Sequence, residues 1–123
     1  MFRILVVDDS RLTLEAVRES LLGYDVAVTE NPLEVPYLIR TGRPDLVLVD
    51  LNMPTMRGDV VARIIRKAFG PGVVVLLHTE VPGDARGLFA SCGADGVVAK
   101  SSDAGVVRDA VAGHLQEHAQ RVA

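Results

Sequence analysis

Three aspartates and one lysine each follow a short apolar run, and their types suit the binding of a cation and of phosphate oxygens. Asp8 and Asp9 follow the first run, Asp50 follows the third, and Lys100 follows the fifth. Carboxylates a few ångströms apart repel by roughly 1 to 4 kcal/mol per pair, unless a hard cation such as Mg²⁺ joins them. An aspartate can act as a nucleophile and form an acyl phosphate, and a lysine offers a point positive charge to a phosphate oxygen. We therefore interpret Asp50 as the acceptor of a phosphoryl group.

Thr79 and Asn52 extend this set of polar residues. Thr79 follows the fourth apolar run, and its hydroxyl can donate a hydrogen bond to a phosphate oxygen. Asn52 lies two residues after Asp50, where Pro54 turns the chain. In an open parallel sheet, ligands bind just beyond the carboxyl ends of the strands. The elements that must position these side chains are therefore parallel strands.

Five apolar runs alternate with segments in which apolar residues recur at helical spacing. Short β-branched runs without alternation are typical of strands buried on both faces. Strands are predicted at residues 3–7, 25–29, 45–49, 73–77 and 96–99. Helices are predicted after Ser10, from Asn31 and Pro32 or properly only near Pro36, near Thr55, at Pro82 and after Ser102 or Asp103. Pro36 should kink the second helix or stand at its true start, and Gly87 should weaken the fourth.

This alternation predicts an α/β fold: a doubly wound, five-stranded parallel sheet with helices on both faces, in three layers. Right-handed crossovers favour the strand order 2-1-3-4-5, which places strands one and three side by side at the switch point. Asp8, Asp9 and Asp50 would then converge at one edge, flanked by Thr79 and Lys100. With 123 residues, a single domain over 1–123 is expected.

Composition excludes several other classes of protein. A net charge of −3 argues against nucleic acid as a direct partner. No apolar run approaches the roughly 20 residues of a membrane span, and the amino terminus lacks a signal-peptide layout. One cysteine, Cys92, cannot form an internal disulfide, and a reducing cytoplasm is the simplest location.

Taken in order, these residues resemble a receiver domain of a bacterial two-component response regulator, over essentially the whole chain. The matching features are Asp8 with Asp9, Asp50, Met53 with Pro54, Gly58, Thr79, Gly93 with Ala94, and Lys100. The resemblance implies a flavodoxin-like (α/β)5 fold and a signalling switch in a phosphorelay rather than an enzyme. Phosphorylation from phosphodonors and self-dephosphorylation are expected of such a domain.

The resemblance also implies roles and partners. Asp50 would be the phosphoacceptor, and Mg²⁺ would be held by Asp9, Asp50 and the Asn52 carbonyl, with Asp8 assisting. Thr79 and Lys100 would sense the phosphoryl group. The donor would be a sensor histidine kinase, a histidine phosphotransfer protein or a small acyl phosphate. The output would be a downstream protein effector, and a homodimer through the fourth helix, fifth strand and fifth helix is a further expectation.

Three positions depart from the family pattern. Glu80 replaces the usual small residue after the sensing threonine, Val97 replaces an aromatic, and Ser101 replaces the proline after the lysine. These changes leave the phosphorylation chemistry possible, but they remove residues on which the family's usual output switch relies. Because strand-end side chains alternate, we expect Glu80 to point to solvent and to mark a docking face of the fourth helix, fifth strand and fifth helix.

Two other functions remain open at this stage. A degenerate receiver would act as a phosphorylation-independent interaction module, although the intact Asp9, Asp50 and Lys100 count against it. A metal-dependent phosphatase with an aspartyl nucleophile would need a second acid–base aspartate, where this chain has Asn52. Purely structural interpretations also exist, since Asp8 and Asp9 alone could cap a helix. We expect His78, near the site, to point sideways.

Overall fold

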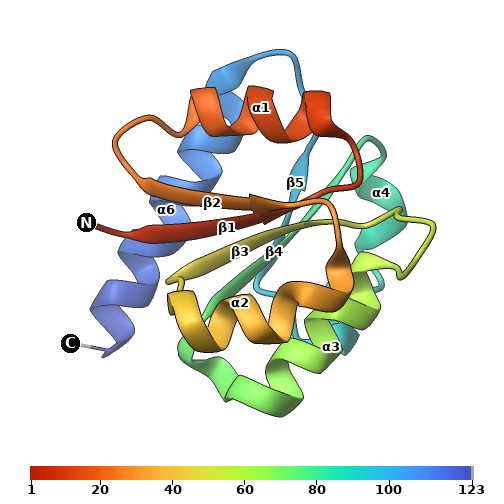
Figure 1. Ribbon diagram of the computed structural model, residues 1–123, viewed down its shortest axis with the longest axis vertical. Coiled ribbons are helices and arrows are strands. Elements are labelled where there is room, and N and C mark those ends of the chain that lie inside the picture. Colours follow the sequence, from red (N-terminus) through yellow and green to blue (C-terminus); the bar gives the residue numbers. More distant parts are fainter. Residues whose placement is uncertain (123) are drawn as a thin grey trace.

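A computed structural model describes residues 1–122 as one five-stranded parallel sheet in the order β2-β1-β3-β4-β5 (Figure 1). The strands are β1 (Arg3–Val7), β2 (Asp25–Thr29), β3 (Leu46–Asp50), β4 (Val74–Thr79) and β5 (Gly96–Ala99). The helices are α1 (Arg11–Ser20), α2 (Val35–Gly42), α3 (Gly58–Phe69), α4 (Pro82–Ala85), α5 (Phe89–Cys92) and α6 (Ala104–Val122), with 3-10 turns η1 (Pro32–Glu34) and η2 (Gly70–Gly72). The predicted doubly wound, flavodoxin-like fold and its strand order are confirmed.

Helices cover both faces of the sheet, so the strands are buried on both sides. Figure 1 shows α1 and α6 on one face and α2 and α3 on the other. Alternate residues of β1 enter different cores: Leu5 and Val7 pack in the core beneath α2, α3 and α5, whereas Ile4 and Val6 pack in the core beneath α1 and α6. Every residue of β3 and β4 is buried, which explains why these strands carry continuous apolar runs.

The regular second helix begins at the later of its two predicted starts. Residues Pro32–Glu34 form a 3-10 turn, and the side chain of Asn31 accepts a hydrogen bond from the Leu33 N–H at 3.0 Å. The regular helix α2 then starts at Val35, so Pro36 stands in the first turn. A proline is tolerated there because the N–H it lacks has no intrahelical partner.

The third helix begins later than predicted. We expected a start near Thr55, but α3 begins at Gly58 and residues 51–57 form a loop. The Gly58 N–H donates to the Leu51 carbonyl at 2.9 Å, which folds the loop back onto the end of β3. A Cβ at Gly58 would overlap the Asp50 carbonyl oxygen. This close approach leaves room only for glycine. The start of α3 is therefore set by a tertiary contact rather than by local helix propensity.

The predicted fourth helix is divided in two. Residues 82–92 form the one-turn helices α4 and α5, separated by residues 86–88. Gly83 and Gly87 lie in or between these turns, and glycine in a helix interior is less favourable than alanine by about 1 kcal/mol. The fifth predicted helix is therefore α6. None of the helices within residues 1–122 combines the length and hydropathy that a membrane crossing requires.

Candidate functional site

The first carboxylate of the site, Asp8, lies directly after β1 and has only 1% of its surface exposed. Its N–H donates to the Thr29 carbonyl at 3.2 Å, which extends the contact between β1 and β2 by one residue. Its Oδ1 accepts from the Ser10 N–H at 2.9 Å, and the Ser10 hydroxyl accepts from the Thr13 N–H as the cap of α1. The helix start therefore fixes Asp8, whereas the neighbouring Asp9 is exposed.

The second buried carboxylate, Asp50, is the last residue of β3 and has 3% of its surface exposed. Its Oδ1 accepts a hydrogen bond from the Asn52 N–H at 3.2 Å. The Leu51 N–H donates to the His78 carbonyl at 3.0 Å, so the backbone stays paired with β4 just beyond Asp50. Both contacts hold the carboxylate at the carboxyl edge of the sheet.

Lys100 joins the two buried carboxylates. It follows β5, and its N–H donates to the Thr79 carbonyl at 2.8 Å. Its Nζ lies 3.1 Å from Oδ2 of Asp8 and 3.1 Å from Oδ1 of Asp50. One ammonium therefore bridges side chains from the ends of two neighbouring strands.

The charges of the site shift the pKa values of its members. Burial, followed by the charge of Asp8, raises the pKa of Asp50 to about 6, although Lys100 and the Asn52 N–H act in the opposite direction. Burial alone would lower the pKa of Lys100, but its contacts with Asp8 and Asp50 raise it above the ordinary value. One lysine thus offsets only part of the repulsion between the carboxylates.

The carboxylates suit a hard divalent cation. Asp8, Asp9 and Asp50 each offer an oxygen, and these atoms lie within 4.8 Å of one another. Oδ2 of Asp8 is buried and accepts no well-directed hydrogen bond within residues 1–122, although the Lys100 ammonium lies 3.1 Å away. Oxygen donors with one exposed, water-accessible member are the coordination that Mg²⁺ prefers. The donor set therefore fits the cation that the sequence predicts.

The remaining predicted residues border this cluster. Thr79 is buried at the end of β4, and its hydroxyl oxygen accepts a hydrogen bond from the Val81 N–H at 3.2 Å. The hydroxyl proton remains available for another acceptor. Asn52 is exposed and touches the site through its backbone N–H. The structure thus brings Asp8, Asp9, Asp50 and Lys100 together, while the roles given to these residues and to Thr79 and Asn52 stay predictions.

Two of the three departures from the family pattern, Glu80 and Ser101, line the same hollow, and Val97 lies elsewhere. Glu80 is exposed, as expected, and it lines a hollow that α1, β5 and α6 also border. Val97 is half-buried and packs against the core beneath α2 and α3. Ser101 is exposed and also lines the hollow, where its hydroxyl accepts from the Asp103 N–H at 3.0 Å.

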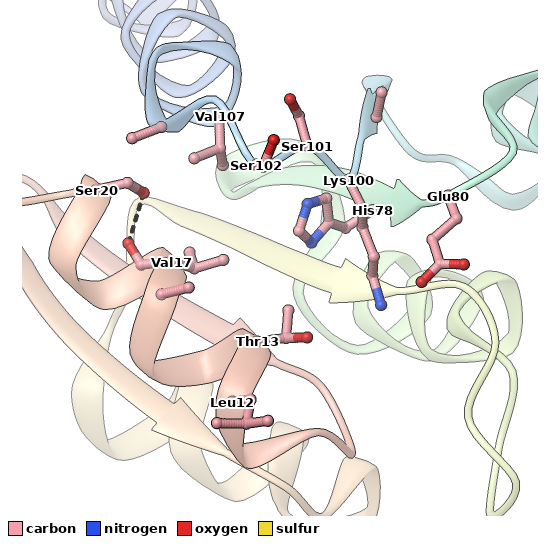
Figure 2. A pocket seen from close by; sticks show the side chains of 13 residues that line it. Leu12, Thr13, Val17, Ser20, His78, Glu80, Lys100, Ser101, Ser102 and Val107 are labelled. Atoms are coloured by element: carbon pink, nitrogen blue, oxygen red, sulfur yellow. Dashed lines mark hydrogen bonds between the residues drawn. The ribbon is translucent and has the colours of Figure 1, made fainter.

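The hollow itself, and the burial of His78 beside it, were not foreseen in the sequence. It measures about 510 Å³ and lies between α1, the end of β4 and the segment that joins β5 to α6 (Figure 2). His78 pairs in register with Asp50 and is 4% exposed. Burial, and then the charge of Lys100, lower the pKa of His78 to about 4. The sequence shows a histidine next to the predicted sensing threonine, which could have pointed to this region. The burial of that histidine, however, depends on the packing of α1 and α6 against the sheet.

The fold and the carboxylate cluster define a class of doubly wound α/β protein with an acidic site at the switch point. A sequence profile of the response regulator receiver domain matches residues 4–112. The chain therefore belongs to the response regulator receiver domain family. Receiver domains act as signalling switches, they generally bind Mg²⁺ in an acidic pocket, and the family implies a histidine kinase as partner.

Named relatives agree with this family. The chain is 40% identical over 79 residues to the response regulator MprA of Mycobacterium sp. (strain KMS), across 63% of this chain and 34% of that protein. It is 41% identical over 76 residues to the DNA-binding response regulator MtrA of Mycobacterium leprae, across 60% of this chain and 34% of that protein. The matches thus span about a third of each relative. A two-component response regulator of the LuxR family from Aurantimonas sp. SI85-9A1 is 33% identical, with a TM-score of 0.83 over 94% of this chain and 85% of that one.

Proposed function

We propose that this chain is a single receiver domain over residues 1–123 in which Asp50 accepts a phosphoryl group from a histidine kinase or a histidine phosphotransfer protein. The observation that carries the proposal is the bridge from Lys100 to both Asp8 and Asp50 at the carboxyl edge of the sheet. Any one of these residues alone has an ordinary structural explanation. Their convergence supports the proposal, because it would bring a nucleophile, a cation site and a phosphate-binding ammonium together in one place.

The chemistry follows from the contacts of Asp50. A carboxylate oxygen of Asp50 attacks the donor phosphorus, a P–O bond forms, and the P–N bond of the donor phosphohistidine breaks. The electron pair of that bond returns to the donor imidazole, which is released, and the product is an acyl phosphate. The Asn52 N–H and the Lys100 ammonium both hold Oδ1, so the carboxylate has a fixed orientation before the donor arrives.

The same residues would make phosphorylation of Asp50 depend on Mg²⁺. Asp8, Asp9 and Asp50, with the Asn52 carbonyl, would hold Mg²⁺, which when bound neutralises charge on phosphoryl oxygens. Ionisation of Asp50 is unfavourable in the metal-free site because burial and Asp8 raise its pKa to about 6. Neutralising the cluster favours the carboxylate form, which is the nucleophile. Lys100 and the Thr79 hydroxyl then bind oxygens of the transferred group.

The partners proposed beyond the donor are a downstream protein effector and, through α4, β5 and α6, a second copy of the chain. We propose no direct contact with nucleic acid, because the chain carries a net charge of −3; MtrA, which is named as DNA-binding, matches over only 34% of its length. The single cysteine and the histidine-kinase partner are consistent with a cytoplasmic location.

Incubation with acetyl phosphate and Mg²⁺ tests the proposal. Intact-mass spectrometry should show one added phosphoryl group, lost in Asp50→Asn and retained in the matched variant Asp109→Asn, which changes an exposed aspartate of α6. A chelator should prevent the addition. A chain that stays unmodified while folded would support a phosphorylation-independent module, and an adduct that persists in Asp50→Asn would contradict the assignment of Asp50.

A further inference from the structure

The side chain of Lys100 crosses β4 on its way to the carboxylates. The strand order places β4 between β3, which ends in Asp50, and β5, which Lys100 follows. Neighbouring strands lie about 4.8 Å apart. An ammonium that lies 3.1 Å from Oδ1 of Asp50 has therefore passed over the end of β4. The side chain that β4 presents at that point borders the path of the lysine stem.

His78 is the residue that β4 presents there. It pairs in register with Asp50 on one side and with Val98 on the other. Alternate residues of a strand point to opposite faces of the sheet, and Leu76 and Val98 both pack in the core beneath α1 and α6. His78 and Lys100 each follow one of these residues by two positions, so they point to that same face. Both line the hollow, and Figure 2 shows both side chains on the side of the sheet that α1 covers.

The imidazole of His78 suits a place beside a lysine stem. It is 4% exposed, so its neighbours hold it in position. Burial, and then the charge of Lys100, lower the pKa of His78 to about 4, so the ring is uncharged at neutral pH and does not repel the ammonium. A lysine carries its charge on a flexible four-carbon stem, and such stems lie along less polar surface while the charged head stays in polar surroundings. A buried flat ring therefore restricts the positions that the ammonium can take.

The backbone at the end of β4 already fixes both ends of the bridge. The His78 carbonyl accepts from the Leu51 N–H at 3.0 Å, next to Asp50, and the Thr79 carbonyl accepts from the Lys100 N–H at 2.8 Å. These two bonds set the distance between the end of β3 and the first atoms of the lysine. The stem of Lys100 is the part that they leave free, and it is the part that the ring of His78 borders.

We propose that His78 is a positioning residue of the site, whose uncharged ring holds the Lys100 stem so that the ammonium stays directed at Asp8 and Asp50. The inference rests on the proposed function, in which Lys100 binds the transferred phosphoryl group. A lysine that is already held in place loses less freedom when that group arrives. His78 acts through Lys100 and transfers no proton. A flat, uncharged ring is what the position requires, so phenylalanine should serve there and alanine should not.

The mobility of the Lys100 side chain tests the proposal without phosphorylation. The chain has two lysines, so a ¹³C-lysine-labelled sample gives two sets of ε-methylene signals, and the exposed Lys67 of α3 is an internal reference. In the metal-free wild type, the two ε protons of Lys100 should differ in chemical shift, and ¹³C relaxation should show a restricted stem. His78→Ala should make these protons equivalent and bring the relaxation toward that of Lys67, whereas His78→Phe should leave the stem restricted. A Lys100 that is as ordered in His78→Ala as in the wild type would overturn the proposal.

Phosphorylation by acetyl phosphate with Mg²⁺ measures the consequence for the site. His78→Ala should lower the rate constant for phosphorylation of Asp50 about three- to tenfold, because neighbouring residues that act through one another are coupled to about this extent, and His78→Phe should lower it less than about twofold. Leu115→Ala controls for lost stability. Leu115 is a buried residue of the same core, and its neighbour His114 borders Gly96 at the start of β5, at the opposite edge of the sheet. Equal losses of rate in His78→Ala and Leu115→Ala would make the role of His78 purely structural and would reject positioning.

The two measurements separate this inference from the proposed function. A wild type that is not phosphorylated, but in which His78→Ala releases Lys100, would reject the proposed function and support the restraint of the lysine. A wild type that is phosphorylated, but whose rate and Lys100 mobility do not change in His78→Ala, would support the proposed function and reject the restraint.

Discussion

Substitution of Asp50 should remove a pH-dependent destabilisation that is largely concealed in the wild type. Burial and Asp8 raise the pKa of Asp50 from 3.8 to about 6. Between these values the folded chain binds a proton more tightly than the unfolded chain. The free energy of unfolding therefore falls as the pH rises through this window. Asp50→Asn cannot ionise, so it should escape this loss.

The size of the effect follows from the pKa. One pKa unit corresponds to about 1.4 kcal/mol, so the ionised Asp50 lowers the free energy of unfolding at neutral pH by about 3 kcal/mol. His78 has the opposite effect, because its pKa falls from 6.5 to about 4. The unfolded chain then binds the proton more tightly, and stability rises with pH by about 3 kcal/mol. In the wild type, the two contributions nearly cancel.

The two single variants should therefore give pH profiles of opposite slope. Without metal, Asp50→Asn should gain stability from pH 4 to pH 7, whereas His78→Phe should lose it. Urea unfolding followed by circular dichroism, in chelator and at constant ionic strength, measures both profiles. Asp109→Asn controls for the loss of a charge. An advantage of Asp50→Asn that is the same at pH 4 and pH 7 would refute the reasoning.

Three further predictions concern packing and charge. Gly58→Ala should lower the free energy of unfolding by about 1–3 kcal/mol, because the added Cβ would meet the Asp50 carbonyl. Gly113→Ala in α6, where the added Cβ enters open space, should raise the free energy of unfolding by about 0.5–1 kcal/mol. Thermal unfolding measures both changes. Glu80→Ala should change the rate of Asp50 phosphorylation by acetyl phosphate less than about twofold at physiological salt, since exposed charges are screened within about 8 Å; a several-fold acceleration would make Glu80 a brake on the site. The Arg66 guanidinium donates to the carbonyls of Gly93 and Val73. Arg66→Met leaves these carbonyls without a donor and should lower the free energy of unfolding, measured in urea, by about 2–3 kcal/mol. A loss below about 0.5 kcal/mol would show that water replaces the guanidinium.

The strands could be predicted because local sequence determines them, and the site cluster because the strands are parallel. A continuous apolar run identifies a strand, and in a parallel sheet the residue that follows each strand lies at the shared carboxyl edge. Asp8, Asp50 and Lys100 meet because β1 and β3 are neighbours and β4 and β5 follow in order. The strand order thus converts three distant sequence positions into one cluster.

The features that sequence reasoning missed depend on contacts between distant residues. Arg66 donates to the Gly93 carbonyl at 2.6 Å, to the Val73 carbonyl at 2.5 Å and to Oδ2 of Asp95 at 2.6 Å. In the sequence, Arg66 is one of several basic residues at the end of a helix, where a solvated charge is the ordinary expectation. The same holds for Gly58, because only the return of the loop onto Asp50 shows why no side chain fits.

If Asp50 is phosphorylated as proposed, the segment between β4 and β5 is where a structural change at the site would spread with the smallest expenditure of free energy. The Lys100 N–H is bonded to the Thr79 carbonyl, so a shift of Lys100 toward a phosphoryl group acts directly on the end of β4. Between β4 and β5 the chain has only the single turns α4 and α5; the Arg86 N–H reaches the Gly83 carbonyl at a long 3.5 Å, whereas the Leu88 N–H donates to the Ala85 carbonyl at 3.0 Å. Short segments outside the regular helices rearrange at a lower free energy than the core strands. Because Val97 fills less space than an aromatic ring, we propose that in a phosphorylated chain a rearrangement of this segment, instead of a ring movement, would alter the proposed docking face.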